Sequence, residues 1–259
     1  AQFEALPINA SLGWNEVGVL DVVIATAISW TVLSAEFNRL AKTQKAGVLG
    51  SGIGYVISTV LSMSLGATLM GYLTLQGNAV NGFDPIEIVN AFGIPLAMAI
   101  FLSVIATNTM VVYGMVSSVI NLTPNRKWSF MKVALVIGAI SVAGSSWLAM
   151  LDKFTEFLTL IGALFVPVFA IMIADYYWLK KASYHQDILL GKGGRYWYQK
   201  GVNLLALSTW LGGFLFSLWL VNMPNNMFGV TLPTFIFSFV AYIGSMKSKA
   251  RLVGERVAH

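Results

Sequence analysis

Long uninterrupted apolar segments dominate this chain, and they limit it to folds that a membrane can hold. Several of them reach the roughly 20 residues that a helix needs to cross about 30 Å of hydrocarbon. They are continuous rather than alternating over about ten residues, which favours helices over a β-barrel. We therefore predict an all-α polytopic membrane protein with seven transmembrane helices, at about 13–36, 45–75, 90–121, 129–149, 154–179, 200–221 and 228–246.

The basic residues orient these segments. All but one of the 16 Lys and Arg residues fall on the same side once the spans are threaded alternately. The exception is Lys153, which shares its side with Glu16, Asp84 and other acidic residues. Cytoplasmic connectors retain Lys and Arg during insertion, so the N-terminus is expected outside and the C-terminus inside. The sequence predicts a multi-pass protein of the plasma or inner membrane.

Composition excludes several functions. Hydrophobic residues make up 57% of the chain and charged residues 10%, and the net charge of +5 is the sum of the basic connectors, so no nucleic-acid partner is needed. There is no Cys, and the two histidines, His185 and His259, lie in a connector and in the tail. Intramembrane catalysis usually needs His, Asp or Glu at mid-depth, where these spans carry almost none. An enzyme, a metal centre or a bound cofactor is therefore not expected.

The first residues also bear on whether this chain is part of a longer protein. They contain no basic segment followed by an apolar core, as a signal peptide would. An odd number of spans with an outside N-terminus predicts that further helices precede this chain in a longer protein.

Polar groups at mid-span mark the candidate binding site. The first span carries Thr26, Ser29 and Trp30, and the third carries Ser103 and the run Thr107-Asn108-Thr109. Hydroxyls, an amide and a flat indole suit a neutral, planar, polar ligand, and hydroxyl oxygens also suit a hard cation such as sodium. The alternative is that the hydroxyls bond to carbonyls of their own helix. We further predict that the first helix is unwound or broken near residues 25–31, where it would offer backbone groups to a ligand.

Four segments resemble one transporter family. The run Ile28-Ser-Trp-Thr-Val-Leu-Ser-Ala-Glu-Phe-Asn-Arg39 resembles the sixth-helix signature of the nucleobase:cation symporter-1 family, which includes cytosine and purine-cytosine permeases and hydantoin transporters. Residues 106–113 are similar to its eighth helix, 157–177 to its tenth, and 196–203 to the start of its eleventh.

The resemblance implies a leucine-transporter-type fold, built from two inverted five-helix repeats and two further helices. On that basis this chain holds helices six to twelve. Residues 1–181 would form the second inverted repeat, and 182–259 a cytoplasmic loop, the last two helices and the tail. Helices one to five of the same protein would then be its partner, in a lipid bilayer.

The resemblance also assigns site residues. It implies that the middle of the sixth helix and the eighth helix bind substrate, which are here Thr26, Ala27, Ser29, Trp30, Asn108 and Thr109. A coupling sodium ion, or a proton in its place, would use the positions of Ser103, Ala106 and Thr107. Two departures stand out: Ala27 replaces a stacking aromatic residue and Ala106 replaces a hydroxyl. The expected function is cation-coupled symport of a nucleobase or related heterocycle, such as a cytosine, purine or hydantoin-like compound.

Three other functions remain open at this stage. A seven-helix receptor shares the predicted topology, although a retinal protein would need a Lys in its last helix and none lies between Lys200 and Lys247. A non-transporting membrane subunit and an amino-acid carrier of the same fold are the other two.

Overall fold

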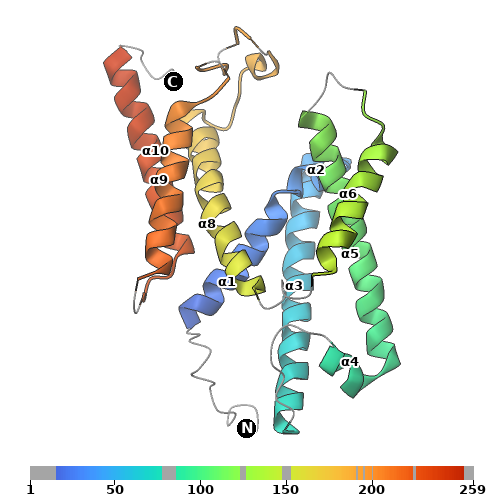
Figure 1. The fold of residues 1–259 in the computed structure, drawn as a ribbon. Helices are drawn as coiled ribbons and strands as arrows, with labels where there is room; N and C mark the ends of the chain where they lie inside the picture. Colours follow the sequence, from blue (N-terminus) through green and yellow to red (C-terminus); the bar gives the residue numbers. More distant parts are fainter. Residues whose placement is uncertain are drawn as a thin grey trace. The chain divides into compact units, whose positions relative to one another are not determined.

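The computed structural model is all-helical over the residues that it describes, which are 16–77, 86–122, 127–147, 153–190, 192–194, 196–199, 201–223 and 226–253. Figure 1 shows these helices in chain order. One isolated backbone bridge, between Gln199 and Val202, is the extent of β-pairing in this part of the chain. The chain divides into two compact units. Among the described residues, one unit runs from Trp30 to Phe154, and the other holds residues 16–29 together with those from Thr155 onward.

The Trp30–Phe154 unit contains α2 (Ser34–Asn38), α3 (Gln44–Leu75), α4 (Ile86–Phe92), α5 (Ile94–Leu122) and α6 (Phe130–Ser145). Helix α5 packs along α6, and α2 packs on α3. Helix α3 begins at Thr43, whose hydroxyl accepts a hydrogen bond from the N–H of Ala46. The turn between α4 and α5 is made at Gly93, with a φ of 76°.

The other unit contains most of α1 (Glu16–Thr31), then α8 (Phe154–Ile173), the π-helical turn η2 (Ala174–Leu179), the 3₁₀ turn η3 (Gln186–Leu189), α9 (Leu204–Val221) and α10 (Thr231–Val253). Helices α9 and α10 pack against each other, and α10 also packs on η2. A core of Ile171, Ala174 and Tyr242 joins them. At the opposite end of α10, the carboxylate of Asp21 accepts hydrogen bonds from the N–H groups of Val230 and Thr231, at 2.7 and 2.9 Å.

Within the described part of the chain, four helical segments are long and apolar enough to cross a membrane: Gln44–Leu75, Ile94–Leu122, Glu156–Leu179 and Leu204–Val221. They coincide with four of the seven predicted spans. The other three predicted spans contain the shorter α1 and α6 and the less apolar α10. The structure thus supports a helical membrane protein, while the count of seven spans stays a prediction.

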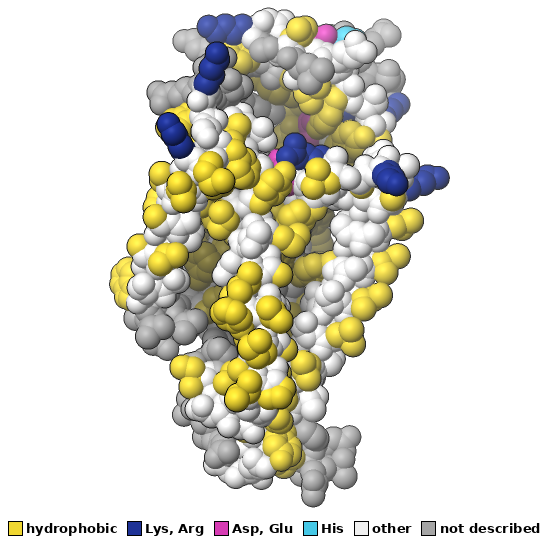
Figure 2. All heavy atoms as spheres, turned by 90° about the vertical axis from the view of Figure 1, so that its right-hand side faces the viewer, with side chains coloured by type: hydrophobic (Ala, Val, Ile, Leu, Met, Phe, Trp, Pro, Cys, Tyr) yellow, Lys and Arg dark blue, Asp and Glu magenta, His cyan; other side chains and the backbone are white. Residues whose placement is uncertain are grey.

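The exterior of the Trp30–Phe154 unit is apolar. In α3 and in α5, no residue of the most apolar stretch is buried against the rest of the described chain. Large side chains such as Leu61 and Phe101 are exposed. Figure 2, which views the right-hand side of Figure 1, shows hydrophobic side chains along the length of this face, with Lys and Arg toward one end. Exposed apolar surface on this scale is what a helix in lipid presents, because the bilayer replaces water as its solvent.

Candidate functional site

The predicted substrate residues of the first span lie in an unbroken helix. Thr26 donates its hydroxyl to the carbonyl of Val22 at 2.8 Å, and Ser29 donates to the carbonyl of Thr26 at 2.7 Å. Ala27 and Trp30 are half-buried on the same helix. Both hydroxyls therefore make the hydrogen bonds within their own helix that were the alternative reading of this segment.

The predicted unwinding at 25–31 is wrong in position. Helix α1 continues to Thr31, and the interruption lies at Val32 and Leu33, before α2 starts at Ser34. The segment 25–31 has no Gly or Pro, and its serine and threonine side chains bond back to helix carbonyls, so nothing in it competes with the helix. The helix is interrupted only at Val32 and Leu33, after these hydrogen-bonded residues.

The interruption is packed against α5. An added Cβ at Gly114 would lie 2.5 Å from Cδ2 of Leu33 and 3.3 Å from its Cδ1, so the Leu33 side chain packs directly on the backbone of Gly114. Helix α2 is also tied to α3, because the hydroxyl of Ser51 donates to Oδ1 of Asn38 at 3.3 Å. The segment just after the predicted site is thus fixed between two helices.

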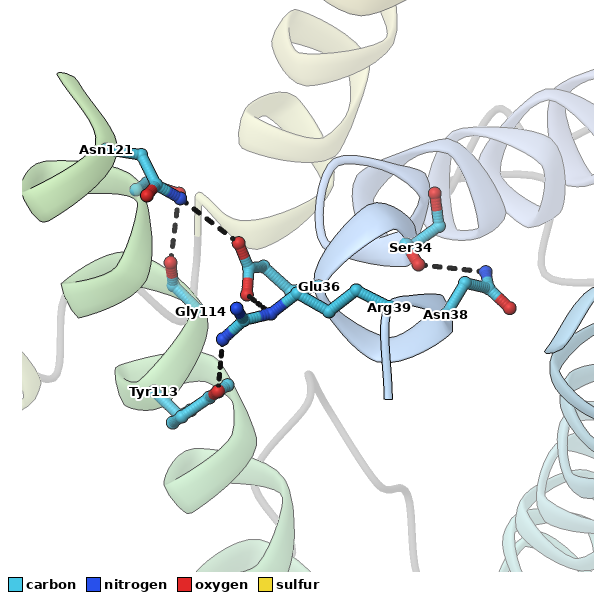
Figure 3. Close-up of polar contacts among 8 residues, drawn as sticks. Ser34, Glu36, Asn38, Arg39, Tyr113, Gly114 and Asn121 are labelled. Carbon is cyan, nitrogen blue, oxygen red and sulfur yellow. Dashed lines mark hydrogen bonds and ion pairs between the residues drawn. The ribbon is translucent and has the colours of Figure 1, made fainter. Parts of the chain in front are cut away.

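Four polar side chains join α2 and the residue after it to α5, and we name them the α2–α5 polar cluster: Glu36, Arg39, Tyr113 and Asn121. Arg39 donates from Nη2 to the hydroxyl of Tyr113 at 2.7 Å, and its Nε lies 2.8 Å from Oε2 of Glu36. Asn121 donates from Nδ2 to Oε1 of Glu36 at 3.4 Å. Figure 3 shows Glu36 between Arg39 and Asn121.

The cluster is charged and lies at the edge of the apolar segments. The Arg39 side chain is 55% exposed and that of Glu36 is 15% exposed. The hydrogen bond to Tyr113 and the charge of Glu36 raise the pKa of Arg39 above its ordinary value, so this side chain remains a cation. Glu36, Arg39 and Tyr113 come from the two segments that resemble the sixth and eighth helices of the transporter family.

The predicted residues of the third span all lie within α5. Ser103, Ala106, Asn108 and Thr109 are exposed and Thr107 is half-buried. Thr109 donates its hydroxyl to the carbonyl of Ile105 at 2.8 Å, again within its own helix.

The predicted substrate residues divide between the two units. Thr26, Ala27 and Ser29 belong to one, and Trp30, Asn108 and Thr109 to the other. In the Trp30–Phe154 unit, the segments that carry Trp30 and Asn108 meet a little further along, at Leu33 and Gly114.

Sequence reasoning missed two polar sites. It assigned no role to Asn121 or to Asp21. A signal was present for Asp21, because a carboxylate within an apolar segment needs a partner. The partner could not be named, since it is a pair of backbone N–H groups more than 200 residues away.

Comparison with known proteins identifies the family. A family model described as permease for cytosine/purines, uracil, thiamine, allantoin matches residues 7–243. The allantoin permease of Bacillus subtilis (strain 168) is 26% identical over 239 residues, covering 86% of this chain and 48% of the relative. The putative allantoin permease of Escherichia coli (strain K12) is 24% identical over 211 residues, covering 77% and 43%.

The relatives also include a plant permease. The purine-uracil permease of Arabidopsis thaliana is 24% identical over 200 residues, covering 72% of this chain and 33% of the relative. The chain thus spans about half the length of these curated relatives. No solved structure matches it significantly. The family match extends over nearly the whole chain and agrees with the four resembling segments, so the chain belongs to the family of permeases for cytosine, purines, uracil, thiamine and allantoin.

Proposed function

We propose that this chain is part of a cation-coupled symporter for a nucleobase or a related planar heterocycle. The observation that carries the proposal is the family match over residues 7–243. Relatives named as allantoin and purine-uracil permeases point to small, neutral, N–H-rich rings. Family membership also favours this function over the receptor and the amino-acid carrier considered above.

The proposed substrate site uses Thr26, Ala27, Ser29, Trp30, Asn108 and Thr109. Asn108 is the most informative of them, because it places an exposed amide on the apolar helix α5, between Thr107 and Thr109. An amide within a membrane span is costly unless it has a partner. A planar ring with N–H and C=O groups can pair with both ends of that amide, and the indole of Trp30 supplies a flat apolar surface.

The proposed cation site uses Ser103, Ala106 and Thr107 on α5. Thr107 offers a hydroxyl oxygen, whereas Ala106 offers only its backbone carbonyl. A site with one hydroxyl fewer has fewer ligands for sodium, so we propose weak sodium coupling or coupling to protons instead.

We propose that the complete transporter also contains helices one to five and lies in the plasma or inner membrane with its basic ends in the cytoplasm. The length of the curated relatives, about twice that of this chain, supports the additional helices. The exposed polar side chains of α5 support them too, because such groups need protein rather than lipid around them.

Uptake measurements test the proposal. Cells that lack nucleobase uptake would express the chain as part of the complete transporter, and radiolabelled uracil, hypoxanthine and allantoin would be offered separately. We expect uptake of at least one of them. Asn108→Ala should raise the KM for that substrate by roughly tenfold, the loss of about one buried hydrogen bond to a ligand.

The matched control is Thr68→Val on α3, whose hydroxyl is exposed and bonds back to the carbonyl of Ser64 at 2.7 Å. It should leave the KM unchanged. Absence of uptake for every ring in the panel, or an Asn108→Ala variant indistinguishable from the control, would contradict the proposed site.

A further inference from the structure

One cavity lies apart from every residue assigned above. It has a volume of about 280 Å³, is partly open, and is lined by α1, α8, α9 and the start of α10, all in the unit that contains Asp21. Much of its wall consists of valine, alanine and leucine side chains. Its polar wall residues are Asp21, Thr159, Ser217, Asn226 and Thr231. An apolar wall with a few placed polar groups is the usual composition of a small-molecule site.

The polar groups differ in how far their hydrogen-bonding capacity is used. Asn226 is fully engaged, since its amide donates to the carbonyls of Leu220 and Gly229 and its oxygen accepts from Phe228 N–H. Ser217 is 1% exposed, and its hydroxyl has no hydrogen-bond partner among the residues that the structure describes. A buried hydroxyl without a partner is costly. Ser217 therefore leaves a donor and an acceptor in the wall.

Asp21 gives the cavity its charge. Its two oxygens each accept one backbone N–H at the start of α10, and each keeps further lone pairs. None of the described residues that line the cavity is Lys, Arg or His. The cavity thus favours ligands that donate hydrogen bonds, and a carboxylate beside it would disfavour anions.

Size selects among the possible ligands. One water occupies about 30 Å³ in the liquid, so the cavity is far larger than a single bound cation needs. A lipid chain would bring hydrocarbon against the carboxylate, which is unfavourable. A small neutral ring with N–H groups satisfies both the volume and the polar wall.

The cavity also lies at a defined end of its unit. It is formed by the start of α1, the end of α9 and the start of α10. Lys180, Lys181, Lys247 and Lys249 lie toward the other ends of the same helices. With basic ends in the cytoplasm, the cavity lies toward the outer ends of these helices.

From these features we infer that the cavity lined by Asp21 and Ser217 is a second binding site, on the outer side, for a small neutral N–H donor such as a ureide, an amide or a nucleobase. This second site does not use the residues proposed for transport, so the two sites can be tested independently.

Photo-crosslinking locates the site directly. The purified protein in lipid nanodiscs would be irradiated with 5-iodouracil, digested and mapped by mass spectrometry. We expect label within 17–25 or 217–231, removed by excess uracil. Orotate, which is uracil with a carboxylate, should need at least about tenfold more concentration to compete, because its charge faces Asp21.

Variants sharpen the test. Ser217→Ala should weaken competition by uracil about two- to tenfold, the effect of one hydrogen bond. Asp21→Asn keeps an acceptor for α10 and should narrow the difference between uracil and orotate to less than about threefold. Val22→Phe, which fills the cavity, should abolish the label. Each variant would first be checked for an unchanged elution volume and melting temperature.

Two results would overturn the inference. One is label confined to 103–109 or absent from both cavity segments. The other is equal competition by orotate and uracil in the unaltered protein. Asn108→Ala distinguishes the two proposals, because it should impair uptake and leave the cavity label in place.

Discussion

Gly229 shows how one residue sets the start of α10. Its φ is 71°, a conformation that side chains with a Cβ rarely adopt. A Cβ there would also lie 2.8 Å from Oδ2 of Asp21 and 2.8 Å from Cγ1 of Val17. The backbone conformation and the close approach of the carboxylate therefore both require glycine.

Gly229→Ala should lower the free energy of unfolding by about 1–3 kcal/mol, because it adds backbone strain and displaces Asp21 from its two N–H donors. Thermal unfolding in detergent, followed by tryptophan fluorescence, would measure the change. Gly244→Ala in α10 is the matched control, because an added Cβ meets nothing within 4 Å. Equal melting temperatures for the two variants would show that the Asp21 contact contributes little.

At the scale of elements, the end of α8 is organised by one carboxylate. Asp175, in the π-helical turn η2, accepts hydrogen bonds from the hydroxyls of Tyr184 and Tyr242, both at 2.9 Å. Asn203, which caps α9, donates to the Tyr242 hydroxyl at 3.3 Å. Burial and the nearby Asp175 raise the pKa of Tyr184, so this phenol remains a donor at neutral pH. Asp175 thus connects η2, the following loop, α9 and α10.

Tyr242→Phe should destabilise this end of the protein by about 1–3 kcal/mol, since it leaves a buried acceptor of Asp175 and the amide of Asn203 without their shared partner. Tyr242 in α10 is 1% exposed, whereas Tyr177, two residues after Asp175 in η2, is 64% exposed. Tyr177→Phe is therefore the control and should be nearly neutral. Limited proteolysis of the 180–203 loop would report the difference, and equal cleavage rates would argue against the anchoring role of Asp175.

The elements show where sequence reasoning succeeds. Length and apolarity located the helices, because membrane spans need about 20 apolar residues whatever their neighbours. The position of the α1–α2 interruption was missed, since it depends on Leu33 packing against Gly114. The π-helical turn at Asp175 was missed for a similar reason: its hydrogen bonds come from Tyr184 and Tyr242, one of them 67 residues away.

At the scale of the whole molecule, the basic connectors predict one orientation in the membrane. The chain contains no Cys, so single cysteines can be introduced without background. Gln76→Cys, after α3, should react with an impermeant thiol reagent on intact cells. Gln186→Cys, in the loop after η2, should react only after permeabilisation, because Lys180 and Lys181 keep that loop in the cytoplasm. The reverse pattern would invert the proposed topology.

During biosynthesis, the contact between Asp21 and α10 can form only after α10 has been translated. The two N–H groups that receive this carboxylate follow it by 209 and 210 residues. At about 5–20 residues per second, a ribosome needs roughly 10–40 s to produce them. During that interval the first helix holds an acidic group without its native donors. A premature stop before α10 would therefore leave α1 with a lasting defect, and quality control that senses exposed intramembrane charge would have a marker for incomplete chains.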